Sequence, residues 1–90
     1  MYKIFYTDEA RKCIQRHDQK LQKKIKEAVE SIAKDPLIGK ALTRELKGRW
    51  SYRISDYRII YRIYQEQIII LILTFGHRRE VYKKESRKNR

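Results

Sequence analysis

The spacing of apolar residues changes at Trp50, and this change constrains the fold more than any other feature of the sequence. Within residues 21–32, apolar residues recur at the spacing of one stripe along an amphipathic helix. From Trp50 onward, apolar and polar residues alternate, which is typical of strands with one face in the core. Helices followed by strands favour an α+β domain in which the helices cover one face of a sheet. The helical stripe consists of Leu21, Ile25, Ala28, Val29 and Ile32.

Shorter signals mark the ends of the other elements. Residues 2–6 are aromatic and β-branched and predict a first strand, after which Thr7 or Asp8 caps a helix. Asp18 predicts a break before the second helix, and Asp35 ends that helix because a residue before proline is pushed out of the helical region. The predicted order is β-α-α-β-β-β, an antiparallel sheet with the two N-terminal helices packed on one face. Its remaining parts are a connection over 37–48 and strands over 50–55, 57–63 and 68–75.

The chain is short enough that only one domain is expected. A chain of 90 residues buries about 60–65% of its unfolded surface, which leaves room for one thin core. We expect this domain to span residues 1–82. Residues 83–90 are polar and basic, and they predict a C-terminal tail that is either a frayed helix or disordered.

The charge of the chain indicates an anionic partner. Lys and Arg number 23 against 11 Asp and Glu, a formal net charge of +12. Such a field attracts polyanions, so nucleic acid, an anionic membrane surface and an acidic protein all remain compatible with it. The apolar run of residues 68–73 is far shorter than the roughly 20 residues that cross a bilayer, so no membrane segment is expected. Residues 1–6 lead directly into charged sequence, so we expect no secretory signal either. We therefore expect the protein to be cytoplasmic.

Motifs for metal and cofactor chemistry are missing from the sequence. Cys13 is the single cysteine, which excludes an intramolecular disulfide and a thiolate metal site. The sequence contains no zinc-ligand spacing, phosphate-binding glycine pattern, Ser/His/Asp set or paired carboxylates. We therefore expect no metal and no cofactor.

Arginines and tyrosines instead interleave on the predicted strands. Arg53, Arg58 and Arg62 stand among β-branched and aromatic residues, where a charge facing the core would be costly. Planar guanidinium groups match phosphate geometry, and tyrosine rings offer stacking surfaces for bases. This pattern predicts a surface for single-stranded RNA, although an ordinary solvent-facing side of the sheet would alternate in the same way. The residues predicted to bind RNA are Lys47, Arg49, Arg62, Arg79 and Tyr52.

Several short motifs together resemble the RelE/ParE superfamily of bacterial and archaeal toxins. They are Leu46-Lys47-Gly48, Trp50-Ser51-Tyr52-Arg53-Ile54, Tyr57-Arg58-Ile59-Ile60-Tyr61 and Gly76-His77-Arg78-Arg79-Glu80-Val81-Tyr82. The resemblance covers nearly the whole chain and implies a RelE-like fold. It also implies a toxin of a toxin–antitoxin system, an endoribonuclease that enters the ribosomal A site and cuts mRNA there. In such toxins the 2′-hydroxyl attacks the adjacent phosphate without a metal ion.

The resemblance also implies roles for individual residues. Arg58 and Arg78 would bind the scissile phosphate, and Arg53 stands where the best-known members have lysine. Tyr82 would stack on or orient the substrate base. Apart from the resemblance, His77 is a candidate acid or base because it stands between Gly76 and two arginines. The family pattern has a second lysine at the position where this chain has Ser55. The YoeB branch has a glutamate at a position that falls near Lys40 in this chain, so this carboxylate is missing here. The candidates for the general base are therefore His77 and Arg53.

The resemblance leaves two other functions open. The ParE branch shares the fold and poisons DNA gyrase, and a non-catalytic basic RNA-binding module would also suit the composition. For an RNA-cleaving toxin, the implied partners are the ribosome, mRNA and a cognate antitoxin. The charge of +12 suits an antitoxin that is acidic and partly disordered when free.

Overall fold

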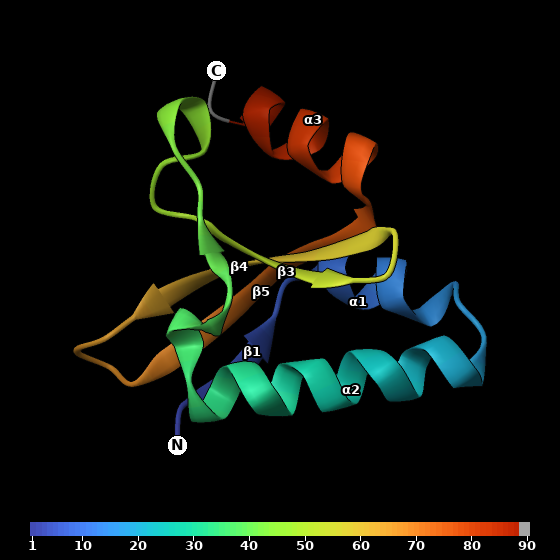
Figure 1. Cartoon of the computed structure of the whole chain (residues 1–90), viewed down its shortest axis with the longest axis horizontal. Coiled ribbons are helices and arrows are strands. Elements are labelled where there is room, and N and C mark those ends of the chain that lie inside the picture. The colour runs from blue at the N-terminus through green and yellow to red at the C-terminus, as the bar shows by residue number, and fades with distance from the viewer. Residues whose placement is uncertain (89–90) are drawn as a thin grey trace.

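A computed structural model describes residues 1–88 as one sheet between helices (Figure 1). The helices α1 and α2 lie on one side of the sheet, and a third helix, α3, lies on the other. Two 3-10 turns, η1 and η2, interrupt the connection between α2 and the central strands. The bounds are β1 Lys3–Tyr6, α1 Asp8–Gln15, α2 Gln19–Lys34, η1 Pro36–Ile38, β2 Lys40–Ala41, η2 Arg44–Leu46, β3 Trp50–Ile54, β4 Tyr57–Tyr64, β5 Ile69–His77 and α3 Arg78–Lys88.

The sheet is mixed, so the α+β fold is confirmed and its purely antiparallel sheet is corrected. Its five strands lie in the order β1-β5-β4-β3-β2. Neighbours are antiparallel except β1 and β5, which run parallel with Lys3 beside Ile69 and Tyr6 beside Ile72. The alternation of side chains along a strand is the same whether its neighbour runs parallel or antiparallel. The sequence pattern therefore did not indicate the direction of the β1–β5 pairing. A parallel pair needs a long crossover, which the helices and the β2–β4 region supply here.

The core lies between the sheet and the first two helices. In α2, Ile25, Ala28, Val29 and Ile32 are buried and Leu21 is partly buried, as the helical stripe predicted. Side chains of β4 and β5 complete the core from the other side. These strand residues are Ile59, Tyr61, Ile70, Ile72 and Phe75.

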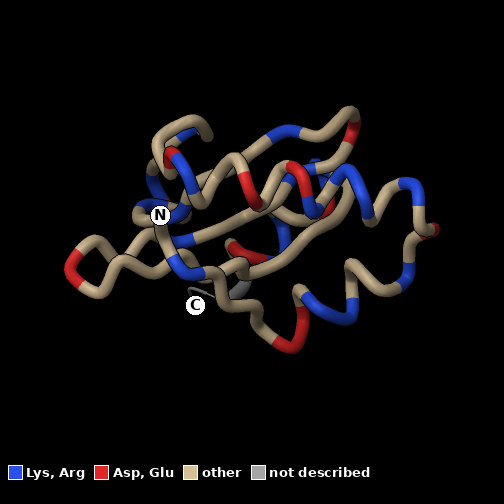
Figure 2. Tube along the Cα trace, turned by 90° about the horizontal axis from the view of Figure 1, so that it is seen from below, with Lys and Arg blue, Asp and Glu red and all other residues tan. Residues whose placement is uncertain are grey.

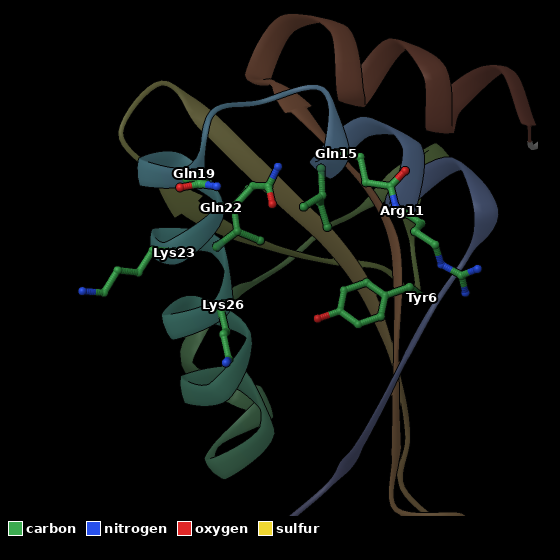
Figure 3. Close-up of a pocket in the computed structure, with 9 residues that line it drawn as sticks. Tyr6, Arg11, Gln15, Gln19, Gln22, Lys23 and Lys26 are labelled. Carbon is green, nitrogen blue, oxygen red and sulfur yellow. The ribbon is translucent and has the colours of Figure 1, made fainter.

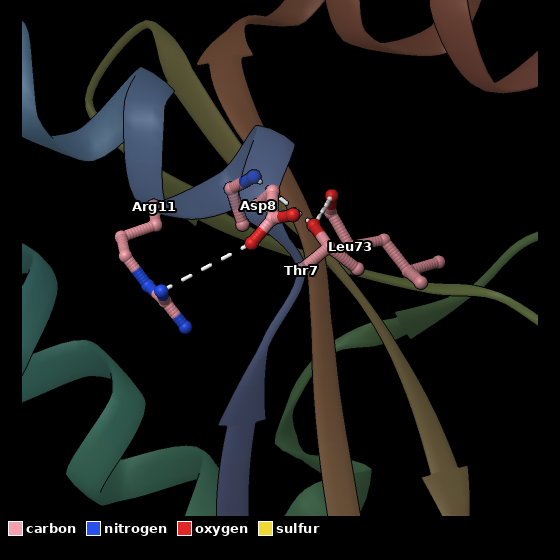
Figure 4. A network of polar contacts seen from close by, with 5 residues as sticks. Thr7, Asp8, Arg11 and Leu73 are labelled. Carbon is pink, nitrogen blue, oxygen red and sulfur yellow. Dashed lines mark hydrogen bonds and ion pairs between the residues drawn. The ribbon is translucent and has the colours of Figure 1, made fainter.

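The first helix begins at Thr7, one of its two predicted caps, and the second begins at the predicted break at Asp18. The Thr7 hydroxyl accepts a hydrogen bond from the backbone N–H of Ala10 (3.0 Å) and donates to the carbonyl of Leu73 (2.6 Å). Figure 4 shows this cap beside the exposed Asp8–Arg11 ion pair. Thr7 therefore ties the start of α1 to β5, in addition to satisfying one free N–H of the helix. Asp18 caps α2 in the same way, through the N–H of Leu21 (2.9 Å).

Of the two alternatives predicted for residues 83–90, a frayed helix or a disordered tail, the described part is helical. Residues 83–88 continue α3, and the side chains of Val81 and Glu85 are buried. The helical spacing of α3 is weak in the sequence because few of its residues are apolar. Glu85 is buried because it forms an ion pair with Arg49, a residue far away in the sequence. Residues 89 and 90 of the predicted tail lie outside the described residues.

Tyr61 connects the core to the start of the 37–48 connection. Its hydroxyl is buried and donates to the carbonyl of Pro36 (2.6 Å). A methyl group at Gly39 would clash with this hydroxyl, so the close approach requires glycine. Burial raises the pKa of Tyr61 from its ordinary 10.0 to about 12.

This raised pKa predicts a loss of stability at alkaline pH. Below pH 10 the Tyr61 phenol is neutral in both the folded and unfolded states, and the stabilisation is fully present. As the pH rises from 10 toward 12, the unfolded chain ionises first and folding weakens by up to roughly 2–3 kcal/mol. Urea denaturation between pH 8 and 12 should show this decline, and Tyr61→Phe should make it shallower. A Tyr61→Phe variant with the wild-type pH dependence would contradict the assignment.

Candidate functional site

Arg53 and Arg58 face each other across two neighbouring strands. They are direct partners in the β3–β4 register, and Gly76 of β5 is the partner of Arg58 on the other side. Ile59 and Tyr61 point into the core, so Arg58 and Arg62 point to the opposite face, where α3 lies. Like charges placed directly opposite destabilise a sheet. Each guanidinium group donates to a neighbouring backbone carbonyl, Nε of Arg53 to Ser55 (3.0 Å) and Nη1 of Arg58 to Tyr57 (3.1 Å).

Arg78 begins α3 at the same end of the sheet. Its backbone N–H donates to the carbonyl of Asp56 in the β3–β4 turn (3.2 Å), which lies between Arg53 and Arg58 in the chain. Helix α3 then passes close over the sheet because Gly76 has no side chain. A methyl group there would lie 3.1 Å from Cγ1 of Val81. The structure thus places the start of α3 beside the Arg53–Arg58 pair.

Tyr82 reaches the same face of the sheet from the second turn of α3. Its side chain is half-buried, and its hydroxyl is hydrogen-bonded to that of Ser51 (3.0 Å). Ser51 precedes Arg53 by two positions in β3, so both side chains point to one face. Ser51 was not among the predicted site residues. Its one sequence signal was a small polar residue that alternates with Trp50 and Tyr52.

His77 lies on the other side of the sheet end. Its partner in β4 is Tyr57, which packs against the core, and the two ring centroids are 6.2 Å apart. The ring of His17 packs edge-on against the same tyrosine at 5.3 Å. Both histidines line a hollow of about 300 Å³ between α1 and α3. His77 is thus near Arg78 in the chain, but its ring is directed toward α1 and away from Arg58.

Two of the residues predicted to bind RNA have structural roles instead. The Nε of Arg49 lies 3.0 Å from Oε2 of Glu85, and both side chains are almost fully buried, with exposed fractions of 8% and 2%. Arg49 is therefore held in the interior between β3 and α3. Tyr52 packs against the core cluster, on the face opposite Arg53. Its aromatic ring suggested base stacking, but the alternation of the strand turns that ring inward.

The other three residues predicted to bind RNA are exposed or half-buried. Lys47 and Arg79 are exposed, and Arg62 is half-buried with Nη1 close to Gly48. Arg79 and Tyr82 also line an open cavity of about 650 Å³ between α3 and η2. Arg62 follows Arg58 by four positions in β4, so the two side chains lie on one face of the sheet.

A second cavity of about 650 Å³ lies away from this site, between β1, α1 and α2 (Figure 3). Burial raises the pKa of Tyr6, which forms one wall. The other labelled residues are glutamines and cations, and none belongs to the candidate site. Within residues 1–88, no group of three His, Cys, Asp or Glu side chains is arranged to hold a metal ion. None of the helices described in this chain is long and apolar enough to cross a membrane.

Comparison with known proteins identifies the family. The family model described as "ParE toxin of type II toxin-antitoxin system, parDE" matches residues 4–82. The chain belongs to this family of toxins. The toxin RelG of Mycobacterium tuberculosis is 33% identical over 85 residues, which are 92% of this chain and 98% of the relative. A toxin YoeB of Synechocystis is 39% identical over 70 residues, 72% of this chain and 81% of the relative.

Solved structures agree with this assignment. The toxin–antitoxin complex RelBE2 of Mycobacterium tuberculosis contains a chain that is 34% identical, with a TM-score of 0.79 over 86% of this toxin and 98% of that chain. The isolated RelE toxin of Escherichia coli has a TM-score of 0.74 over 98% of both chains at 19% identity, which bears on the fold alone. The chain is thus a toxin of a type II toxin–antitoxin system with a RelE-like fold.

Proposed function

We propose that this toxin is a ribosome-dependent endoribonuclease that cuts mRNA in the A site and so inhibits translation. The observation that carries the proposal is the direct pairing of Arg53 with Arg58 on the face that Tyr82 reaches. Similarity to toxins named RelG and YoeB over most of the chain supports the RNA-cleaving branch. The proposal places the toxin in the cytoplasm, where ribosomes translate mRNA.

The chemistry follows from what an arginine-rich, carboxylate-poor face can do. The RNA's own 2′-hydroxyl attacks the adjacent phosphorus, which leaves a 2′,3′-cyclic phosphate and a 5′-hydroxyl. Arg58 and Arg78 carry the extra negative charge of the pentacoordinate phosphate, and preorganised donors of this kind are among the largest contributions to catalysis. Planar guanidinium groups offer each phosphate two parallel hydrogen bonds. The reaction needs no metal ion for this charge stabilisation.

Proton transfer is assigned to groups on the same face as the phosphate clamp. Tyr82 places a hydroxyl there, and Arg53 lies in the same strand two positions from Ser51. His77 is the third candidate, although its ring packs toward Tyr57 and α1. Either Arg53 or Tyr82 is therefore the better-placed proton acceptor, with ribosomal groups completing the site.

Inhibition of DNA gyrase is the second candidate function, because the matching family model is described as a ParE toxin. A three-way assay separates it from RNA cleavage and from passive RNA binding. Purified toxin is incubated with translating ribosomes and a defined mRNA, with the mRNA alone, and with gyrase and relaxed plasmid. We expect cleavage only when ribosomes are present. Inhibited supercoiling without cleavage would favour the gyrase function, and RNA retention alone would favour a binding module.

The charge of the toxin predicts binding that depends strongly on salt. Figure 2 shows Lys and Arg positions along most of the trace, and the net charge is +12. Each phosphate that the toxin neutralises releases a counterion, so the affinity for ribosomes should fall steeply between 50 and 200 mM salt, about 10³-fold or more for six contacts. Sedimentation with ribosomes over a salt series measures this slope. A flat response would mean that the cations serve another purpose.

The same charge predicts the chemistry of the antitoxin. Several similar folds were solved as toxin–antitoxin complexes, including the RelBE2 complex of Mycobacterium tuberculosis and the YoeB–YefM complex of Staphylococcus aureus. We infer a cognate antitoxin that neutralises this toxin by direct binding. Its toxin-binding segment is expected to be acidic and to order on binding.

A further inference from the structure

Helix α3 is held to the domain mainly by polar contacts. Among its described side chains, Val81 and Glu85 are buried, and most of the others are charged and exposed. Val81 packs over Gly76, whereas Glu85, Tyr82 and Ser86 each reach a polar partner in the segment from η2 to β3. One apolar side chain restricts the rotation and sliding of a helix only weakly. The polar partners therefore decide where along the sheet each α3 residue lies.

The strongest of these contacts is the ion pair between Arg49 and Glu85. Its two side chains are exposed by only 8% and 2%, and the atoms Nε and Oε2 lie 3.0 Å apart. Removing either side chain would take this close counter-charge away from a buried charge, which costs more than losing an exposed ion pair. Because the hydrogen bond is directional, α3 satisfies it in one register only.

This ion pair is one helical turn from Tyr82. Residues three positions apart lie on the same side of a helix, so Glu85 and Tyr82 both face β3. Their partners are Arg49, directly before β3, and Ser51, two positions later within it. The two contacts form a ladder between α3 and the start of β3, with the ion pair deep and the Tyr82–Ser51 hydrogen bond closer to Arg53.

We propose that Arg49 and Glu85 are positioning residues for Tyr82. By fixing the register of α3, the ion pair holds the Tyr82 hydroxyl at Ser51, beside the arginines that clamp the phosphate. The proposal rests on the proposed RNA cleavage for its kinetic consequences. It assigns Arg49, a residue whose charge suggested direct RNA contact, an indirect role from the interior.

A double-mutant cycle tests whether the ion pair acts through Tyr82. Glu85→Gln keeps the shape of the side chain and removes its charge. We expect the single-turnover rate of A-site cleavage to fall by about tenfold to a hundredfold, the effect of small misplacements in an active site. The affinity for ribosomes should change by less than about twofold, since the altered side chain is buried. In a Tyr82→Phe background, Glu85→Gln should cause little further loss of rate.

The matched control is Glu80→Gln, the same chemical change at an exposed position of α3. It should leave both the rate and the affinity at wild-type values. If Glu85→Gln lowered the rate equally in the wild-type and Tyr82→Phe backgrounds, the proposal would be overturned, because the ion pair would then act independently of the hydroxyl. A loss confined to ribosome affinity would overturn it too.

A second variant keeps the test informative if Glu85→Gln does not fold. The double change Arg49→Met with Glu85→Leu replaces the ion pair by apolar side chains, which in other proteins preserves or raises stability. We expect this variant to fold and to cleave slowly, because apolar contacts do not fix the register. Full cleavage activity in a folded variant would show that the ion pair only stabilises α3.

A readout that does not depend on cleavage separates this proposal from the proposed function. NMR should show slow exchange of the Tyr82 hydroxyl proton in the wild-type chain and fast exchange in the Met/Leu variant, while the α3 amides stay protected in both because the helix remains folded. If the wild-type toxin cuts no RNA but shows this difference, the proposed function is wrong and the positioning role stands. If the Tyr82 signals are identical in the two proteins, the positioning role is wrong whatever the activity.

Discussion

Replacing Arg58 or Arg78 by alanine is expected to raise the barrier to A-site cleavage by about 2–4 kcal/mol, the typical effect of losing one preorganised charge-stabilising group. The guanidinium groups matter most when extra negative charge develops on the phosphate, so the loss should appear in the rate. Binding should suffer much less, since the chain has 23 Lys and Arg residues and its surface charge is redundant. Single-turnover cleavage and ribosome sedimentation measure the two quantities separately.

Three further variants sharpen this test. Lysine at either position should restore binding but not the full rate, because an ammonium group lacks the planar two-point contact. Arg11→Ala is the matched control, since it removes an equal charge from an exposed side chain on α1, on the far side of the sheet. Near wild-type cleavage by the Arg58→Ala and Arg78→Ala proteins would mean that the site lies elsewhere, even within this family.

Truncating Ile32 to alanine is expected to destabilise the fold by about 2–5 kcal/mol, through lost burial and the cavity left behind. Ile32 is fully buried in the α2 stripe, between helix and sheet. A small domain is stable by only about 5–15 kcal/mol, so this change should remove a large share of the total. Urea denaturation followed by circular dichroism measures the difference in midpoint.

Leu37→Ala provides the comparison for the core variant. Leu37 has a similar side chain, but it is 58% exposed in η1, so its truncation should change stability by no more than about 0.5 kcal/mol. If the two variants unfolded at the same urea concentration, this would contradict the packing of α2 against the sheet described above.

The helices and the meander were determined by local sequence signals. The α2 stripe, the Thr7 and Asp18 caps and the alternation within β3 and β4 each depend on residues a few positions apart. Such patterns reflect the geometry of a single element, and a single sequence contains them in full. The same holds for the motifs around Arg53, Arg58 and Arg78. They lie in short contiguous segments, so the order of residues along the chain was enough to indicate the family.

Only the tertiary structure decided how these segments meet. The parallel pairing of β1 with β5 joins residues more than sixty positions apart, and no local pattern records its direction. The alternation of β3 turned Tyr52 to the core, and the Arg49–Glu85 ion pair connects residues 36 positions apart. An arginine on a strand has the same sequence signature whether it binds RNA or a buried carboxylate. Its role depends on which distant side chain folds against it, and that is settled only when burial, hydrogen bonding and charge are satisfied together.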